Sequence, residues 1–212
     1  MKHDSVIFDM DGTLLDTLGD LHSAVNAVLT AYSFPTRTLE EVRTFVGNGV
    51  KVLVDRSLPE GTDKCTAEAV LRDFKTYYSL HSTDTTSVYP GITELLEKLR
   101  DEGVPCAIVS NKIDPAVKKL ADMFFPGLVK AAIGEKAGIA RKPAPDSVFE
   151  AIRITGAKNP VYVGDSEVDV ETAKNAGIDG IFVTWGFRSR DSLRTAGAEV
   201  IADTAEELYE KL

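Results

Sequence analysis

The sequence is poor in cysteine and lacks any long apolar run. Its 212 residues include two cysteines, Cys65 and Cys106, whose spacing fits neither a metal site nor a redox pair. We therefore expect a reduced, intracellular protein in which both cysteines are ordinary packing residues. No apolar run approaches the length of a membrane span, and the N-terminus becomes acidic too quickly for a signal peptide. We therefore expect a cytoplasmic protein that has no membrane partner.

Positive charge is also scarce. The chain has 24 Lys and Arg residues against 33 Asp and Glu residues, for a formal net charge of -9. This charge repels nucleic acid and anionic membranes, so neither is an expected partner. An anionic small molecule would need local cations in order to bind. The 43% hydrophobic content is ordinary for a globular protein, and the sequence shows neither an internal repeat nor a low-complexity tract.

One stretch near the start organises the rest of the chain. Residues 6–8 (Val-Ile-Phe) predict a buried strand of a parallel sheet, which stops at Asp9. Asp11 follows two residues later, so both carboxylates point to the same side of an extended chain, and Gly12 permits a tight turn. Two carboxylates at one point require a proton or a cation, and Mg²⁺ is usual where phosphate is handled. A turn that merely carries acids is the alternative.

The segment after this motif has helical spacing as far as about residue 80. Apolar positions recur with helical period over four segments, at about residues 18–32, 39–46, 50–58 and 66–80. A polar stretch, residues 82–87, is typical of a linker. We therefore predict a helical cap domain over residues 17–85 and a core domain over residues 1–16 and 86–212. A helical layer packed on the sheet is the alternative.

From residue 89 onward, helices and strands alternate. Further strands are predicted at residues 105–109, 129–133, 161–163, 181–183 and 200–201. The strand before Ser110 is expected to stop there, and Asp114 and Asp146 are expected to cap the helices that they open. This alternation predicts an α/β fold with a doubly wound, Rossmann-like parallel-sheet core.

Polar residues gather where three of these strands end. Asp9 and Asp11 follow the first strand, Ser110 and Asn111 follow the second, and Asp165 follows another. Because doubly wound sheets bind ligands beyond the carboxyl ends of their strands, we expect these side chains to converge. The sequence therefore predicts a ligand site at this edge of the sheet.

Two more charged residues fit this edge. Asp169 follows Asp165 by four residues, and four acids in one pocket would destabilise the fold unless a metal bound there; a structural or regulatory metal site is the alternative. Lys142 lies in a loop stiffened by prolines and could offset the acids and attract a phosphate oxygen, although most lysines are solvated surface charges. The hydroxyl of Ser110 could donate to an anion, while a simple turn would explain this residue equally well.

Together these motifs resemble those of the haloacid dehalogenase superfamily. In this chain they are Asp9-Met10-Asp11-Gly12-Thr13, then Ser110, then Lys142, and finally Gly164-Asp165-Ser166 with Asp169. Their order and spacing agree across nearly the whole chain. The helical insert after the first motif resembles the cap of the subclass that carries its lid there.

The resemblance implies a role for each acid. Asp9 is expected to be the nucleophile that forms an aspartyl-phosphate, and Asp11 the general acid and then the general base. Dehalogenases of the superfamily lack this second aspartate, so its presence favours phosphoryl transfer. Mg²⁺ would be held by Asp9, Asp11 and Asp165, with Asp169 supporting the ion. The phosphoryl group would be bound by Ser110, Asn111 and Lys142.

Three segments, residues 42–49, 109–112 and 184–187, resemble phosphoglycolate phosphatases. In that interpretation the loop Gly47-Asn48-Gly49 presents backbone N–H groups to the substrate, and an ordinary turn between helices is the alternative. Trp185 is expected at the rim of the site. The carboxylate of phosphoglycolate would need a cation, for which the sequence offers Arg43, Lys51, Lys112 and Arg188.

The predicted function is a Mg²⁺-dependent phosphatase acting on a small phosphate monoester, with 2-phosphoglycolate as the first candidate. The protein is expected to be a monomer or homodimer. A sugar phosphomutase shares the same motifs, and a pyrophosphatase or a general small-phosphate hydrolase is a further alternative. From another class, a non-catalytic metal-binding protein on this scaffold would carry the same acids, although the intact pair Asp9 and Asp11 argues against it.

Overall fold

The computed structural model describes residues 2–212, and the chain divides into two compact units. One unit comprises Met1–Leu15 and Val88–Leu212, and the other comprises Asp16–Ser87. Two short strands, β2 (Leu15–Asp16) and β3 (Ser87–Val88), pair with each other where the chain passes between the units. The helical unit is the segment for which we predicted a cap, and that role stays a prediction.

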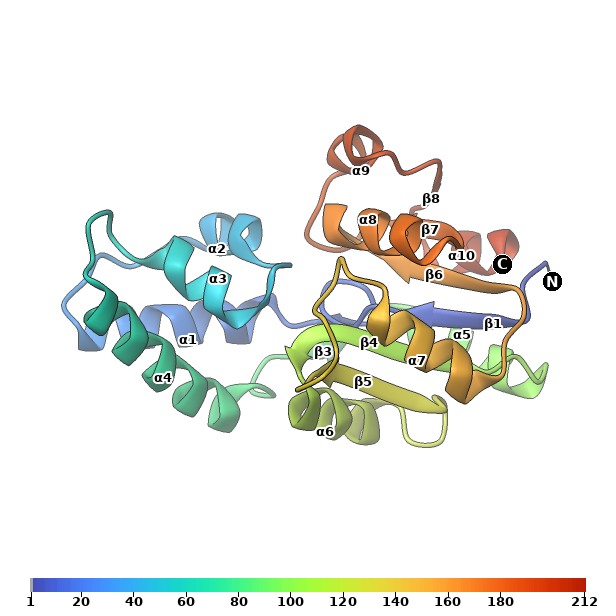
Figure 1. Cartoon of the computed structure of the whole chain (residues 1–212), viewed down its shortest axis with the longest axis horizontal. Helices are drawn as coiled ribbons and strands as arrows, with labels where there is room; N and C mark the ends of the chain where they lie inside the picture. The colour runs from blue at the N-terminus through green and yellow to red at the C-terminus, as the bar shows by residue number, and fades with distance from the viewer. Residues whose placement is uncertain (1) are drawn as a thin grey trace. The chain divides into compact units, whose positions relative to one another are not determined.

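A six-stranded sheet forms the centre of the first unit. Its strands are β1 (Ser5–Phe8), β4 (Cys106–Ile113), β5 (Ala131–Glu135), β6 (Pro160–Gly164), β7 (Asp179–Val183) and β8 (Val200–Ala202). They lie in the order β5-β4-β1-β6-β7-β8, and every neighbouring pair is parallel (Figure 1). The structure confirms the predicted doubly wound α/β fold. All the carboxyl ends therefore lie at one edge of the sheet.

The sheet separates two apolar clusters. Val6 and Phe8 of β1 belong to one cluster and Ile7 belongs to the other, because successive side chains of a strand point to opposite faces. On the first face pack α5 (Ile92–Asp101), α6 (Asp114–Phe124) and α10 (Ala205–Lys211). On the second face pack α7 (Asp146–Thr155), α8 (Glu167–Ala176) and α9 (Arg190–Ala196). Burial on both faces explains the continuous apolar runs at residues 6–8 of β1 and 106–109 of β4.

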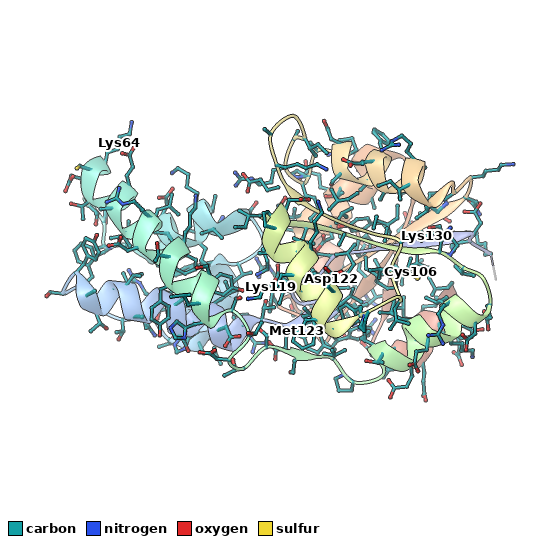
Figure 2. All side chains as sticks on the ribbon, turned by 90° about the horizontal axis from the view of Figure 1, so that it is seen from below. Lys64, Cys106, Lys119, Asp122, Met123 and Lys130 are labelled. Carbon is teal, nitrogen blue, oxygen red and sulfur yellow. The ribbon has the colours of Figure 1, made fainter. Side chains whose placement is uncertain are left out.

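Helix α6 shows how the sequence pattern produces this packing. Figure 2 labels Lys119, Asp122 and Met123 on this helix, and all three are exposed. Leu120 and Ala121, which lie between them in the sequence, are buried against the sheet. Helical periodicity thus places the apolar stripe on the core and the charges in solvent.

The two cysteines differ in their surroundings. Cys106 begins β4 and is buried, and burial raises the pKa of its thiol to about 12. It is therefore a packing residue, as predicted. Cys65 is exposed on α4 (Lys64–His81), so the prediction of a packing role is wrong for this residue.

Strand β4 is longer than the sequence predicts. It continues through Ser110 and the two following residues to Ile113, and its pairing with β5 shifts in register between Val109 and Ile113. The predicted stop at Ser110 is wrong, because it relied on side-chain polarity. Sheet pairing uses only backbone groups, so polar side chains at a functional edge do not end a strand.

Neither of the two predicted aspartate caps forms. Asp114 is the first residue of α6, where its carboxylate accepts a hydrogen bond from the Gly134 N–H at 3.0 Å and pairs with Lys118 at 2.6 Å. Asp146 likewise lies inside α7, whose cap position is Pro145. Both residues stand one position too late to cap, although a negative charge in the first turn still favours the helix dipole.

The second unit contains four helices. They are α1 (Leu18–Ala31), α2 (Leu39–Phe45), α3 (Gly49–Ser57) and α4. Asp20 of α1 is 1% exposed, and its carboxylate accepts N–H and O–H donors from Thr85 and Thr86 at 2.6–3.0 Å. This bonding attaches the returning chain to the first turn of α1. Among the described helices, not one combines the length and apolar character that crossing a bilayer requires.

Candidate active site

Three aspartates meet beyond the carboxyl ends of β1 and β6. Asp9 follows β1 directly, and its N–H donates to the Val163 carbonyl at 2.8 Å, which continues the pairing of the two strands. Asp165 follows β6, and Asp169 lies in the first turn of α8. One carboxylate oxygen from each lies within 4.8 Å of the others, and all three residues are buried. The predicted convergence of Asp9 and Asp165 at this edge is present.

Lys142 inserts its ammonium group among these acids. It lies in the loop between β5 and α7, and its side chain is 3% exposed. The Nζ atom is 2.9 Å from Asp9 Oδ1 and 2.8 Å from Asp169 Oδ1, and it donates to the Tyr162 hydroxyl at 2.9 Å. Burial alone would lower the pKa of Lys142, but the charges of Asp169 and Asp9 outweigh burial and raise it. Lys142 is therefore a permanent cation at this site.

Asp169 holds Lys142 in place. Its Oδ1 atom accepts from Lys142 and from the Tyr162 hydroxyl at 2.8 Å. Its Oδ2 atom accepts from the Ser166 N–H at 3.1 Å and from the Ser166 hydroxyl at 2.6 Å, which forms the capping box of α8. Burial would raise the pKa of Asp169, but Lys142 and these hydrogen bonds lower it below its ordinary value. This carboxylate is thus fixed and ionised.

Asp165 is fixed from the other side. Its carboxylate accepts the Thr13 hydroxyl at 3.2 Å and the Phe187 N–H at 2.7 Å. A Cβ atom at Gly12 or Gly186 would collide with this carboxylate, so the close approach of both backbones requires glycine. Burial, followed by repulsion from Asp169, raises the pKa of Asp165 to about 7 despite the Phe187 N–H.

The carboxylate of Asp11 is held by β4. Lys112 Nζ lies 3.1 Å from Asp11 Oδ1, and the Ser110 hydroxyl donates to Asp11 Oδ2 at 3.3 Å. The Lys112 N–H in turn donates to the Ser110 hydroxyl at 3.1 Å. Asn111 donates its side-chain N–H to the Lys142 carbonyl at 3.1 Å, which joins β4 to the Lys142 loop. The extended end of β4 therefore positions both Asp11 and Lys142.

The charge balance of this centre suits a divalent cation. The carboxylates of Asp9, Asp165 and Asp169 face the single ammonium of Lys142, so three negative charges minus one positive charge leave two when all are ionised. Burial, followed by the charge of Asp169, also raises the pKa of Asp9 well above its ordinary value, against the opposing effect of Lys142. Carboxylate oxygens are the ligands that Mg²⁺ prefers, so the residues present fit this ion.

Residues 6–183, which contain the four aspartates, Lys112 and Lys142, match the family model of haloacid dehalogenase-like hydrolases. The chain belongs to this family. A phosphoglycolate phosphatase from Rhodobacter capsulatus is 35% identical over 191 residues, which cover 87% of this chain and 85% of the relative. A second, from Pseudomonas syringae pv. tomato, is 37% identical over 190 residues, which cover 86% and 70% of the two chains.

A solved structure is also similar to this haloacid dehalogenase-like hydrolase. A crystal structure from Lactobacillus delbrueckii subsp. bulgaricus, of a protein provisionally assigned as a phosphoglycolate phosphatase, is 42% identical. It superposes with a TM-score of 0.95 and covers 100% of this chain and 98% of that chain. The comparisons together support a phosphoric monoester hydrolase.

The remaining predicted residues lie in the helical unit or in separate ion pairs. Gly47 and Asn48 connect α2 to α3, and Gly49 begins α3. Arg43 of α2 lies 3.4 Å from Glu40. In this same unit Lys51 pairs with Asp55, and in the core unit Arg188 pairs with Glu167 at 2.7 Å. A role for these residues in substrate binding stays a prediction.

Sequence reasoning missed several partners of the hydrolase's acids. These are Thr13, Tyr162, Ser166 and the backbone of Phe187. The spacing Ser166-x-x-Asp169 is a capping-box signal, which could have revealed that pair. Tyr162 lies within a buried strand and has no such signal. Trp185, expected at the rim, is half-buried against the core and donates its indole N–H to the Thr13 carbonyl at 3.0 Å.

Proposed function

We propose that this hydrolase cleaves a small phosphate monoester, with 2-phosphoglycolate as its preferred substrate, through a phosphoryl group carried on Asp9. The observation that supports it most is the meeting of Asp9, Asp165 and Asp169 with Lys142 at one sheet edge. The phosphoglycolate phosphatases among the relatives support the choice of substrate.

The chemistry has two displacements at phosphorus. An oxygen of Asp9 bonds to phosphorus while the bond between phosphorus and the ester oxygen breaks, and Asp11 gives its proton to the leaving oxygen. A water molecule then attacks phosphorus and gives its proton to Asp11, which releases phosphate and regenerates the Asp9 carboxylate. Ser110 and Lys112 hold Asp11 at 3.3 and 3.1 Å, so its carboxylate is already oriented for both proton transfers.

Lys142 and Ser110 would bind the transferring phosphoryl group. Lys142 lies 2.9 Å from the nucleophile, so its charge acts where phosphoryl oxygens arrive. The Ser110 hydroxyl lies beside Asp11. Asn111 contributes indirectly, because its side-chain N–H donates to the main-chain carbonyl of Lys142 and so holds the Lys142 loop. Positioned cations and donors of this kind account for most of the catalysis of phosphoryl transfer.

Mg²⁺ is the cofactor that we assign to this centre. The carboxylates of Asp9 and Asp165 and the main-chain carbonyl of Asp11 would hold it, with Asp169 acting through Lys142. When bound, the ion would withdraw negative charge from the phosphoryl oxygens. Burial, followed by the charge of Asp169, raises the pKa of both Asp9 and Asp165, so such an ion would offset the cost of keeping these carboxylates ionised.

Substrate choice would fall to the helical unit, which we assign as a cap over residues 17–85. The loop Gly47-Asn48-Gly49 has positive φ angles at both glycines, so it makes a tight turn between α2 and α3. Arg43 precedes this loop on α2. These features make the loop the first segment to mutate for changes in substrate range.

Mg²⁺ should raise thermal stability more at high pH than at low pH. The folded pKa of Asp165 is about 7, above its unfolded value. A carboxyl with a raised folded pKa supports stability at low pH, and this support is lost as pH rises from about 4 through about 7. Bound Mg²⁺ would offset that loss. We expect the melting temperature to rise clearly with MgCl₂ at about pH 8 and little at about pH 5.

Thermal unfolding at both pH values, with NaCl of equal ionic strength as the reference, measures this effect. In Asp165→Asn the difference between the two pH values should shrink, because the titrating carboxyl is gone. An equal rise at both pH values in the unmodified protein would contradict the assignment of the ion to this carboxylate.

A panel of phosphate esters tests the proposed substrate. Phosphate release would be measured with Mg²⁺ and with excess chelator for 2-phosphoglycolate, glucose 1-phosphate, glucose 6-phosphate, pyrophosphate and p-nitrophenyl phosphate. We expect kcat/KM for 2-phosphoglycolate to exceed the others by at least about 10²-fold, and chelator to stop the reaction. Interconversion of the glucose phosphates without free phosphate would instead indicate a mutase, and full activity in chelator would refute the metal assignment.

A further inference from the structure

Lys112 is a buried lysine whose ammonium contacts the second aspartate of the first motif. Its side chain is 5% exposed, and Nζ lies 3.1 Å from Asp11 Oδ1. Burial of a lysine is costly and is seldom found without a carboxylate partner. Lys112 lies on β4 beyond Ser110, where the sequence pattern had ended the strand. The sequence therefore did not predict its contact with Asp11.

We infer that Lys112 binds the carboxylate of the substrate's leaving group and makes the enzyme selective for phosphate esters of small 2-hydroxy acids. This inference rests on the proposed function, in which Asp11 gives its proton to the leaving oxygen. In such an ester only three covalent bonds separate the leaving oxygen from a carboxylate oxygen. A cation 3.1 Å from Asp11 is therefore within reach of that carboxylate.

The chemistry of an ammonium group permits this double use. It carries three N–H donors, so one nitrogen can serve a carboxylate of the protein and a carboxylate of the substrate together. In a buried site such a charge-assisted contact is stronger than at the surface, and an ester without the carboxylate would lose it. The contact between Lys112 and the substrate carboxylate would therefore favour leaving groups that carry a carboxylate over those that do not.

The other cations proposed from the sequence are placed differently. Arg188 pairs with Glu167 through two N–H groups, at 2.7 and 3.1 Å. Lys142 lies between Asp9 and Asp169, at the nucleophile rather than at the residue that faces the leaving group. Arg43 and Lys51 belong to the helical unit. Within the described core unit, Lys112 is the candidate whose contact is with Asp11 itself.

The test compares two esters that differ in the carboxylate. For 2-phosphoglycolate and ethyl phosphate, kcat/KM would be measured with Mg²⁺ in the unmodified enzyme and in Lys112→Met. Loss of support for Asp11 lowers both values, so the informative quantity is their ratio. We expect the preference for 2-phosphoglycolate to fall by about 30-fold or more in Lys112→Met, whereas Lys112→Arg, which retains the charge, keeps a larger part of it.

Two controls make the result decisive. Lys119→Met removes an exposed lysine of α6, labelled in Figure 2, and should leave the ratio unchanged. Lys112→Gln provides a second neutral variant if Lys112→Met does not fold, as judged by circular dichroism. A selective unmodified enzyme whose preference survives in the neutral variant would overturn the inference alone. An unmodified enzyme without any preference for 2-phosphoglycolate would overturn the proposed function, and the inference with it.

Discussion

Replacing Asp9 with asparagine is expected to lower kcat by at least about 10⁴-fold, because an amide cannot accept the phosphoryl group in the first displacement. The same substitution removes a buried carboxylate whose pKa is raised by burial first and then by the charges of Asp169 and Asp165. We therefore expect the melting temperature without Mg²⁺ to stay the same or to rise. Loss of activity with unchanged or improved stability separates a chemical role from a structural one.

The matched control for this variant is Asp122→Asn. Asp122 is an exposed acid of α6 and is labelled in Figure 2. This control should keep full activity and a normal melting temperature. Steady-state kinetics with 2-phosphoglycolate and thermal unfolding supply both measurements. If Asp9→Asn kept activity near that of the unmodified enzyme, another group would have to be the nucleophile.

The second large effect is expected for Lys142→Met. This ammonium lies 2.9 Å from Asp9 and 2.8 Å from Asp169, and removing it leaves buried carboxylates without their counterion. Breaking a buried ion pair in this way costs about 3–5 kcal/mol in the free energy of unfolding. Activity should fall by at least about 10²-fold, because the phosphoryl oxygens lose their resident cation.

A double variant distinguishes electrostatics from packing. Adding Asp169→Asn to Lys142→Met removes one uncompensated charge, so it should recover part of the lost stability without recovering activity. The pair of Lys118 and Asp114 supplies the comparison, because the Lys118 side chain is 58% exposed and Lys118→Met should therefore cost less than about 1 kcal/mol. Urea unfolding measures all three. A cost for Lys142→Met no greater than that for Lys118→Met would show that the buried pair contributes little.

The position of the acidic centre was predictable because it depends on strand ends. The buried apolar run of residues 6–8 marks β1, so Asp9 falls at the carboxyl end of that strand, and Asp165 falls in the same way at the end of β6. Parallel topology then brings the two ends to one edge whatever the loops between them do. Sequence reasoning succeeds here because burial and topology act in the same direction.

The support around these acids was less predictable. Ser110 and Lys112 have polar side chains on a paired strand, so a pattern based on hydrophobicity ends the strand too early. The sequence predicts Tyr162 as an ordinary residue of a core strand. In the structure its hydroxyl donates to Asp169. Such contacts join segments far apart in the chain, and no local pattern contains that information.

Two short helices near the C-terminus were not predicted from the sequence. Helices α9 and α10 each span seven residues, and each has at most two residues that are buried. Two turns give only a weak helical period, although α2, which also spans seven residues, was predicted from its pattern. Their caps, Ser189 and Thr204, give the clearest local signals, since each side chain accepts a backbone N–H three residues later.

The central claim is that Asp9 carries the phosphoryl group during turnover. An acyl phosphate on an aspartate is reduced by borohydride to homoserine, whereas a free carboxylate is not, so borohydride quenching followed by peptide mass spectrometry detects the intermediate directly. We predict homoserine at position 9 when 2-phosphoglycolate and Mg²⁺ are present, none without substrate, and none in Asp9→Asn. An unmodified Asp9 in an enzyme quenched during rapid turnover, or homoserine in place of another aspartate, would contradict it.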